Sequence, residues 1–267
     1  MKIISKFKKI VIKIGSSSII DETTNKVKIK WLRTICKDIV ALSNENKKVA
    51  FVSSGAVALG SKKISNKKTI RKLEEKQAAA AIGQIELANC WQQTLKKNQV
   101  NSAQLLLTLD DSEIRRRYLN VRKTISSLHK NKIIPIINEN DTVATDEIKF
   151  GDNDRLSARV AEIIKADLLI LLSDVSGLYD KDPKKNKKSK LIKEVQSINK
   201  SVMKAASFTN NQFAKGGMAT KIMAAKIATS AGCGMVIVNG NSKKIIQKTF
   251  SEREGTYFHP KKRKKNN

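Results

Sequence analysis

The sequence predicts an α/β protein, a three-layer α/β/α sandwich in which helices cover both faces of a mainly parallel sheet. Hydrophobic periodicity alternates between strand and helix along the whole chain. Two continuous apolar runs, Ile133–Ile137 and Leu168–Leu172, are typical of strands buried on both faces. Glycines follow several predicted strands, where the loops of an open α/β sheet bring the backbone close to a ligand. These are Gly15, Gly55, Gly177 and Gly240.

The predicted elements follow one another in regular order. A β-branched run over residues 9–14 predicts the first strand, which ends at Gly15. Apolar residues at helical spacing predict a helix over 27–42. A strand over 49–52 stops at Ser53-Ser54-Gly55. The remaining predictions are a helix over 77–97, a strand over 104–107, a helix over 113–130, the strand 133–137, a helix over 156–165, the strand 168–172, a helix over 218–231 and a strand over 235–238.

Length and composition favour one domain. The chain has 267 residues, of which 40% are hydrophobic, enough for a sizeable core. No stretch is rich enough in Pro, Gly or Ser to act as a linker. We expect residues 1–259 to form the domain and residues 260–267 to be a basic, disordered tail.

Several protein classes are excluded. No run approaches the roughly 18 apolar residues that span a bilayer, and the lysine-rich start lacks the pattern of a signal peptide. Three widely spaced cysteines, Cys36, Cys90 and Cys233, fit neither a disulfide framework nor a zinc knuckle. The sequence therefore predicts a cytoplasmic protein in a reducing compartment, with no membrane partner.

The charge requires a separate interpretation. The chain has 53 Lys and Arg against 24 Asp and Glu, a formal net charge of +29, which is also a feature of nucleic-acid binders. The lysines are spread along the chain, and the densest blocks, 61–76, 181–193 and 261–265, carry no interleaved aromatic side chains for base stacking. We interpret the blocks as solvated loops and a tail, and expect no specific nucleic-acid partner.

The candidate phosphate-binding residues do not form a P-loop or a G-x-G-x-x-G motif. Lys13 lies inside the first apolar strand, immediately before Gly15, and a lysine there is costly to bury unless it meets an anion. The alternative is that this is an edge strand whose lysine faces water. Near the other end, Lys215–Lys221 runs into a helix whose N-terminal N–H groups could hold phosphate.

An acidic segment, Asn138–Asp154, stands apart from the basic chain. Its six acidic residues and one lysine give it a net charge of −5. Its Asn and Asp side chains could hold the ammonium group of an amino acid or help to coordinate a metal. The chain has only two histidines, His129 and His259, both distant in sequence from these loops. A reaction without a general base is favoured, such as attack by a carboxylate, which is ionised at pH 7.

Six motifs in order resemble those of the glutamate 5-kinases, a family of the amino acid kinase superfamily. They are Lys13-Ile-Gly15, Ser53-Ser-Gly-Ala56, Asn138-Glu-Asn-Asp141, Gly151-Asp-Asn-Asp154, Ser173-Asp-Val-Ser-Gly-Leu-Tyr179 and Gly216-Gly-Met-Ala-Thr-Lys221. The resemblance covers about residues 8–259. It implies the amino acid kinase fold and ATP-dependent phosphorylation of the γ-carboxylate of L-glutamate to L-glutamyl 5-phosphate, the first step of proline biosynthesis. The alternatives are another carboxylate kinase of the superfamily and an inactive, RNA-binding relative.

The resemblance also implies a role for each matching residue. Lys13 and Lys221 would neutralise the transferring phosphoryl group, Asp154 would hold both lysines, and Mg²⁺ would bridge the phosphates of ATP without an assigned protein ligand. The ATP-binding residues would be Lys13, Gly15, Ser173, Asp174, Lys215, Gly216, Gly217, Met218, Ala219, Thr220 and Lys221. The glutamate-binding residues would be Ser54, Asp141 and Asn153.

Further expectations from the resemblance concern partners and chain length. It implies feedback inhibition by L-proline, a homo-oligomer, and a short form without the C-terminal PUA domain that many bacterial members carry. Residues 207–215 depart from the Gly- and Thr-rich loop that is usual in the family.

Overall fold

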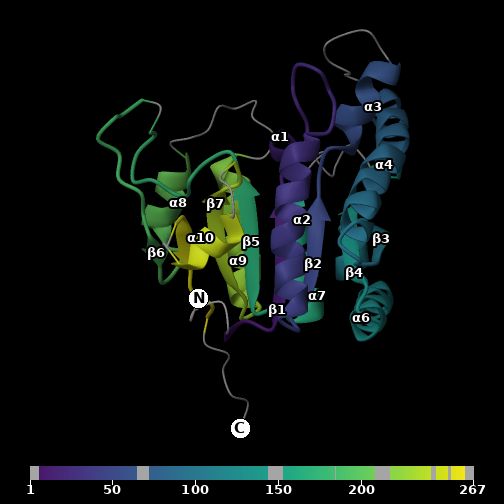
Figure 1. Ribbon diagram of the computed structural model, residues 1–267. Coiled ribbons are helices and arrows are strands. Elements are labelled where there is room, and N and C mark those ends of the chain that lie inside the picture. Colours follow the sequence, from purple (N-terminus) through teal and green to yellow (C-terminus); the bar gives the residue numbers. More distant parts are fainter. Residues whose placement is uncertain are drawn as a thin grey trace.

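The computed structural model describes residues 6–64, 72–143, 153–183, 185–207, 217–241, 245–251 and 254–261 (Figure 1). These residues form an eight-stranded sheet in the order β3-β4-β2-β1-β5-β7-β8-β6. The strands are β1 (Lys9–Ile14), β2 (Lys48–Ser53), β3 (Ser102–Leu107), β4 (Ile134–Glu139), β5 (Leu168–Ser173), β6 (Glu194–Val195), β7 (Gly234–Asn239) and β8 (Thr256–Phe258). All neighbouring strands are parallel except β7 and β8. The prediction of a mainly parallel sheet is confirmed.

Strand β1 lies inside the sheet. It pairs with β2 on one side and with β5 on the other, so that Lys13 is opposite Val52 and Leu171. The alternative that Lys13 belongs to an edge strand is therefore wrong. From β1 the chain first builds the β2, β4 and β3 side of the sheet, and then returns to start the other side at β5. The boundary between β1 and β5 is thus a topological switch point, where open α/β sheets bind ligands.

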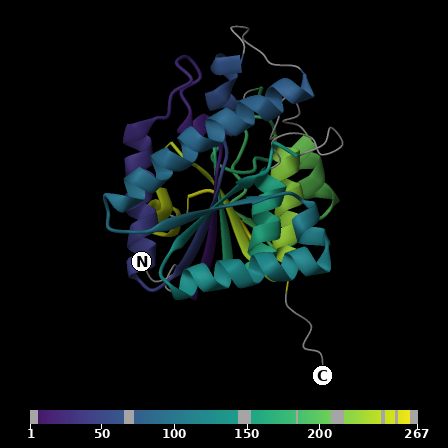
Figure 2. The same cartoon turned by 90° about the vertical axis from the view of Figure 1, so that its right-hand side faces the viewer.

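Helices cover both faces of the sheet, as the sequence predicts (Figure 2). Apolar side chains of α1, α2, α3, α4 and α10 pack on one face, and those of α6, α7, α8 and α9 pack on the other. The helix bounds are α1 (Ser16–Ile19), α2 (Ile29–Asn44), α3 (Ala56–Ile64), α4 (Leu73–Lys96), α5 (Asp110–Glu113), α6 (Arg115–Lys130), α7 (Asn153–Ile164), α8 (Lys200–Ser207), α9 (Met218–Ser230) and α10 (Ile245–Ser251).

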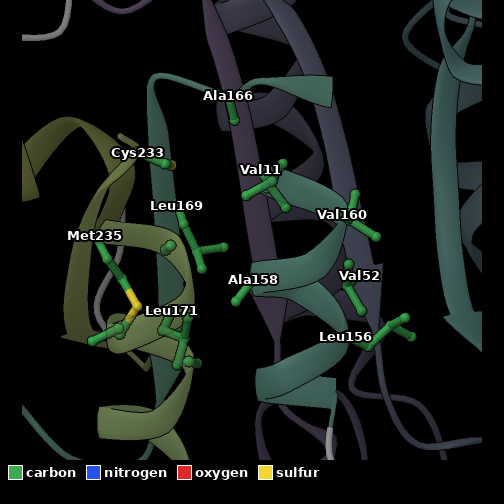
Figure 3. Close-up of a cluster of buried hydrophobic side chains, with 14 of the residues drawn as sticks. Val11, Val52, Leu156, Ala158, Val160, Ala166, Leu169, Leu171, Cys233 and Met235 are labelled. Atoms are coloured by element: carbon green, nitrogen blue, oxygen red, sulfur yellow. The ribbon is translucent and has the colours of Figure 1, made fainter. Parts of the chain in front are cut away.

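Side chains of β1 alternate between the two layers of the core. Ile10, Ile12 and Ile14 face α2, whereas Val11 faces α7 together with Leu169 of β5 (Figure 3). Lys13 is two residues after Val11 in the strand, so its side chain projects from the same face of the sheet, toward α7. The apolar packing of this layer therefore sets where the Lys13 ammonium group can reach.

The structure contains elements that periodicity did not indicate, and the most consequential is α3. The basic block 61–76 was expected to be a loop, but α3 extends to Ile64 and α4 begins at Leu73. Helices α3 and α4 touch backbone to backbone, because a Cβ atom on Gly83 would overlap the carbonyl oxygen of Ala56. Such a contact depends on small residues rather than on an apolar stripe, and so has no periodic signal. The short elements α1, α5, α8, α10, β6 and β8 were also not predicted.

Both ends of the acidic segment belong to regular structure. Asn138 and Glu139 are the last residues of β4, and Asn153 and Asp154 are the first residues of α7. Residues 144–152 lie outside the described part of the chain.

Near the predicted C-terminal boundary of the domain, the N–H of Lys261 donates to the carbonyl oxygen of Thr229, 3.0 Å away. The proposed boundary between domain and tail at residue 259 stays a prediction. Of the described helices, none has the length and apolar character needed to cross a membrane.

The contact between α3 and α4 generates a stability prediction. In a helix interior, Gly→Ala normally stabilises by about 1 kcal/mol. At position 83 the added methyl group has no space, so we expect Gly83→Ala to lower the free energy of unfolding by about 2 kcal/mol, the range typical of overpacking. Urea unfolding followed by circular dichroism measures the change. Ala81→Ser, at an exposed position of the same helix, is the control; an equal or higher stability of Gly83→Ala would contradict the contact.

Candidate active site

The candidate site lies at the carboxyl ends of the parallel strands, which in Figure 1 is the upper end of the sheet. Lys13 is the fifth residue of β1, Asp154 is the second residue of α7, and Lys221 is the fourth residue of α9. Both helices pack on the face of the sheet from which Lys13 projects. The fold thus brings together three residues that are 141 and 67 positions apart in sequence (154 − 13 and 221 − 154).

One carboxylate pairs with two ammonium groups. Asp154 Oδ1 is 2.6 Å from Lys13 Nζ, and Asp154 Oδ2 is 3.2 Å from Lys221 Nζ. The hydroxyl of Thr220 is also 3.0 Å from Asp154 Oδ2 and 2.8 Å from the carbonyl oxygen of Gly217. All three charged side chains are nearly withdrawn from water, with side-chain exposures of 11% for Lys13, 2% for Asp154 and 6% for Lys221. The trio predicted from the sequence resemblance is therefore a single ion-paired cluster.

The helix ends explain the positions of these charges. A negative charge in the first turn of a helix is stabilised by the helix dipole, and Asp154 occupies such a place in α7. A positive charge in the first turn is disfavoured, and Lys221 occupies that place in α9. Lys221 is therefore stabilised by Asp154 rather than by its own helix. An anion that bound beside Lys221 would gain from both the ammonium group and the N-terminus of α9.

The protonation state of Asp154 follows from two opposing effects. Burial by itself raises the pKa of this carboxyl group, whereas the charges and hydrogen bonds of Lys13 and Lys221 lower it, and the net pKa lies below the ordinary value. Asp154 is therefore ionised at neutral pH. It acts as a fixed counter-charge for the two ammonium groups and has no proton to give.

Three other expected nucleotide-binding residues surround the end of β1. Gly15 directly follows β1, and a Cβ atom there would be 3.7 Å from Lys13 Nζ, so the missing side chain leaves space beside the ammonium group. Ser173 ends the neighbouring strand β5, and its hydroxyl donates to Asp174 Oδ1, 3.0 Å away. Asp174 itself is exposed to solvent. These residues lie near Lys13 at the carboxyl ends of β1 and β5, and their role in nucleotide binding stays a prediction.

The segment around α9 is described in part. Gly217 precedes α9 in an extended conformation, and Ala219 and Thr220 lie in its first turn. Met218 is 6% exposed and belongs to the hydrophobic core, so any contact of this residue with a nucleotide would use its backbone. Lys215 and Gly216, together with most of the unusual loop 207–215, lie outside the described residues.

A second polar group adjoins the trio through Asn153, the neighbour of Asp154. The side-chain amide of Asn153 donates to Ser54 Oγ at 2.8 Å and to Asn138 Oδ1 at 3.1 Å. Ser54 follows the end of β2, where Gly55 turns the chain with a positive φ of 118°. Asn153 Oδ1 is buried and accepts no hydrogen bond from the residues that the structure describes. Two of the three expected substrate-binding residues, Ser54 and Asn153, are thus in direct contact.

The third, Asp141, lies two residues beyond β4 and is 8% exposed. It is the last acidic residue before the part of the acidic segment that is outside the described residues. The sequence resemblance assigned no role to Asn138 or to Gln84 of α4, yet Asn138 Nδ2 donates to Gln84 Oε1 at 2.6 Å. Asn138 had a signal, since it opens one of the motifs, whereas Gln84 lies between Gly83 and Ile85, outside every motif, and had none.

Neither histidine is near this cluster. His129 Nε2 contacts the carbonyl oxygen of Val49 at the amino-terminal end of β2, and burial lowers the pKa of its imidazole. His259 Nε2 is 3.2 Å from Glu194 Oε2, on the edge strand β6. Both histidines therefore lie away from the ion-paired cluster, and catalysis without histidine stays a prediction.

The ion pairs generate a pH-dependent stability prediction. We expect Asp154→Asn to lower the free energy of unfolding at pH 7, because two buried ammonium groups lose their counter-charge. The folded pKa of Asp154 lies below the unfolded value of about 3.9, so its stabilisation is complete above that value and is lost as the pH falls through the folded pKa. Urea unfolding at several pH values should show a gap between wild type and variant that is constant from about pH 7 to 5 and closes below about pH 4.

The exposed carboxylate Asp174 supplies the matched control, because Asp174→Asn should leave the stability nearly unchanged at every pH. A gap for Asp154→Asn that stayed the same at low pH would mean that the carboxylate is not the source of the stabilisation.

Comparisons with known proteins indicate the family of this chain. The sequence model of the amino acid kinase family matches residues 8–239. A glutamate 5-kinase from Pelagibacter ubique is 52% identical over 94% of this chain and 68% of its own length. A glutamate 5-kinase from Paramagnetospirillum magneticum is 47% identical over 95% of this chain and 68% of its own length.

Solved structures share the fold at low sequence identity. UMP kinase from Bacillus anthracis has a TM-score of 0.65 at 15% identity, covering 96% of this chain and 97% of its own. Isopentenyl phosphate kinase from T. acidophilum has a TM-score of 0.63 at 17% identity, covering 94% of this chain and 100% of its own. The chain therefore belongs to the amino acid kinase family, and within that family its sequence groups it with the glutamate 5-kinases.

Proposed function

We propose that this protein transfers the γ-phosphoryl group of ATP to the γ-carboxylate of L-glutamate, forming L-glutamyl 5-phosphate in the first step of proline biosynthesis. The observation that carries the proposal is the pairing of two buried ammonium groups with one carboxylate at the switch point of the sheet. The relatives named glutamate 5-kinase indicate which acceptor this site serves.

The phosphate half of the site consists of Lys13, Gly15, Lys221 and the start of α9. In the proposed complex the two ammonium groups contact oxygens of the transferring phosphoryl group, where negative charge is spread in the transition state. Asp154 keeps both groups in place before the nucleotide arrives, so little reorganisation is needed during the reaction. The space beside Gly15 lets a phosphate approach the backbone N–H groups that follow β1. Ser173, Asp174 and the segment 215–221 complete the nucleotide site in this proposal.

The glutamate half consists of Ser54, Asn153 and Asp141. Asn153 presents a buried oxygen without a donor among the described residues, and the α-ammonium group of glutamate would supply one. The buried carboxylate of Asp141 adds a negative charge for the same ammonium group. The Ser54 hydroxyl accepts its bond from Asn153 through oxygen, and its own proton is available for a carboxylate of the substrate.

The chemistry requires no general base. The γ-carboxylate of glutamate is ionised at pH 7, so one of its oxygens can attack the γ-phosphorus directly. A new P–O bond forms to the carboxylate while the bond to the bridging oxygen of ADP breaks, and that oxygen leaves with the bonding electrons. The protein contributes alignment and charge neutralisation, which account for most of the catalysis of phosphoryl transfer.

Mg²⁺ forms part of the proposal as an ion held by the phosphates of ATP. Mg²⁺ sites in kinases typically combine one or two carboxylates with substrate phosphates and water. The exposed carboxylate of Asp174, at the end of β5, fits that donor set, whereas Asp154 is already committed to two lysines. When bound, the ion would neutralise charge on the phosphates.

The proposal also includes the cellular location of the reaction, its inhibition and the oligomeric state of the protein. We place the reaction in the cytoplasm, where Cys36, Cys90 and Cys233 would stay reduced; all three are free thiols in the structure. Feedback inhibition by L-proline and a homo-oligomeric state belong to the same proposal, on the strength of the sequence resemblance.

Trapping the acyl phosphate tests the proposed reaction. Acyl phosphates react with hydroxylamine, so incubation with ATP, Mg²⁺ and L-glutamate should produce γ-glutamyl hydroxamate. Aspartate, N-acetylglutamate and glutarate are tested in parallel, and we expect little product from them. Product from one of these acids instead of glutamate would favour another carboxylate kinase of the superfamily. Tight binding of an RNA at physiological salt without any hydroxamate would favour the inactive, RNA-binding alternative.

The phosphate half generates a kinetic prediction. We expect Lys221→Ala to lower kcat by about 100-fold or more, equivalent to about 3 kcal/mol of lost transition-state stabilisation. The matched control is Lys226→Ala, because Lys226 is an exposed lysine of the same helix. Steady-state kinetics with the hydroxamate assay measure both variants. Near-normal kcat in folded Lys221→Ala would remove this residue from the mechanism.

A further inference from the structure

Four side chains form a continuous hydrogen-bonded chain from α4 to the glutamate half of the site. Gln84 Oε1 accepts from Asn138 Nδ2 at 2.6 Å, Asn138 Oδ1 accepts from Asn153 Nδ2 at 3.1 Å, and Asn153 Nδ2 also donates to Ser54 Oγ at 2.8 Å. The two asparagines are almost completely buried, with exposures of 1% for Asn138 and 4% for Asn153. Gln84, at the other end, is half-buried.

A backbone group sets the direction of the whole chain. The N–H of Glu139 donates to Asn138 Oδ1 at 2.9 Å, and a backbone N–H can only donate. Asn138 must therefore present its oxygen to Glu139 and to Asn153, and its nitrogen to Gln84. Asn153 in turn must present its nitrogen to Asn138, because the oxygen of Asn138 cannot donate.

This direction leaves the oxygen of Asn153 for a ligand. Both N–H bonds of its amide are used by Asn138 and Ser54, and Asn153 Oδ1 accepts nothing from the described residues. If the amide of Asn153 rotated by 180°, its nitrogen would face the ligand and repel an ammonium group. The orientation of this single amide therefore decides whether the site accepts a donor or an acceptor from its substrate.

We propose that Asn138 and Gln84 are positioning residues that fix the amide of Asn153 for the α-ammonium group of the substrate. This inference rests on the proposed function, since it takes the ligand of Asn153 to be glutamate. Neither residue touches the substrate in this view. Gln84 is the residue of this hydrogen-bonded chain that lies farthest from the substrate, and it acts through the nitrogen of Asn138. Helix α4, which carries Gln84, therefore contributes to substrate affinity.

The surroundings of Gln84 hold it in place. Gly83, its neighbour, contacts the backbone of α3 at Ala56, and α3 begins two residues after Ser54. Further along α4, Trp91 Nε1 donates to Ser53 Oγ at 2.9 Å. Helix α4 is thus attached to the loop that carries Ser54 on both sides of Gln84, and the acceptor at position 84 keeps a fixed distance from the substrate half of the site.

Substitution of Gln84 tests the inference. Gln84→Met keeps the length and volume of the side chain but removes the acceptor, so Asn138 loses the bond that holds its nitrogen. We expect KM for glutamate to rise about tenfold, the effect of one buried donor left unsatisfied, while kcat and KM for ATP stay within about twofold. Gln84→Glu retains an oxygen acceptor and should restore KM for glutamate to within about threefold of wild type. Gln92→Met, at an exposed glutamine of the same helix, is the matched control.

The possible outcomes separate this inference from the proposed function. If wild type forms no hydroxamate from glutamate, the proposed function fails and this inference falls with it. If wild type is active, the inference alone is overturned by any of three results: an unchanged KM for glutamate in Gln84→Met, an equal rise in both KM values, or no restoration by Gln84→Glu. A purely structural role of Gln84 would lower the unfolding temperature and change kcat and both KM values together.

Discussion

The ion pairs of Asp154 with Lys13 and Lys221 are the interaction on which the rest of this site depends. They join the central strand β1 to the first turns of α7 and α9, which reach the sheet from widely separated parts of the chain. Each charge would be costly to bury alone, and the pairing offsets most of that cost. The strand and the two helix ends must therefore meet within hydrogen-bonding distance, which fixes the geometry of the edge where phosphate is expected to bind.

The same cluster limits the electrostatic cost of the positive charge that gathers at this site. Two ammonium groups and the N-terminus of α9 point toward one place, in a protein whose net charge is already +29. A single buried carboxylate with a lowered pKa offsets part of this charge. Because Asp154 carries one negative charge against two positive ones, the cluster of three side chains retains a net positive charge, which in the proposed function attracts the phosphates of ATP.

In the proposed function, two adjacent residues of α7 serve the two halves of the site. Asp154 turns to the lysines, and Asn153 turns to Ser54 and Asn138. The first turn of α7 is therefore shared between the phosphate side and the acceptor side, and a shift of this helix would displace both together. Since phosphoryl transfer depends on alignment of donor and acceptor, placing both contacts on one rigid turn preserves that alignment. The hydrogen bond from Asn138 to Gln84 extends the same rigidity to α4.

The sequence by itself determined the fold class, the strand β1 with its lysine, and the family to which the motifs belong. These follow from periodicity and from short local motifs, which depend only on neighbouring residues. Helix α3 was missed because its contact with α4 uses Gly60 and Gly83 rather than an apolar stripe. Only the tertiary structure decided that Lys13 is interior, since strand order depends on pairing between distant segments. It also decided that Gln84 contacts the site. The hydrogen bond between Gln84 and Asn138 joins residues 54 positions apart in sequence, and no local sequence pattern predicts such a contact.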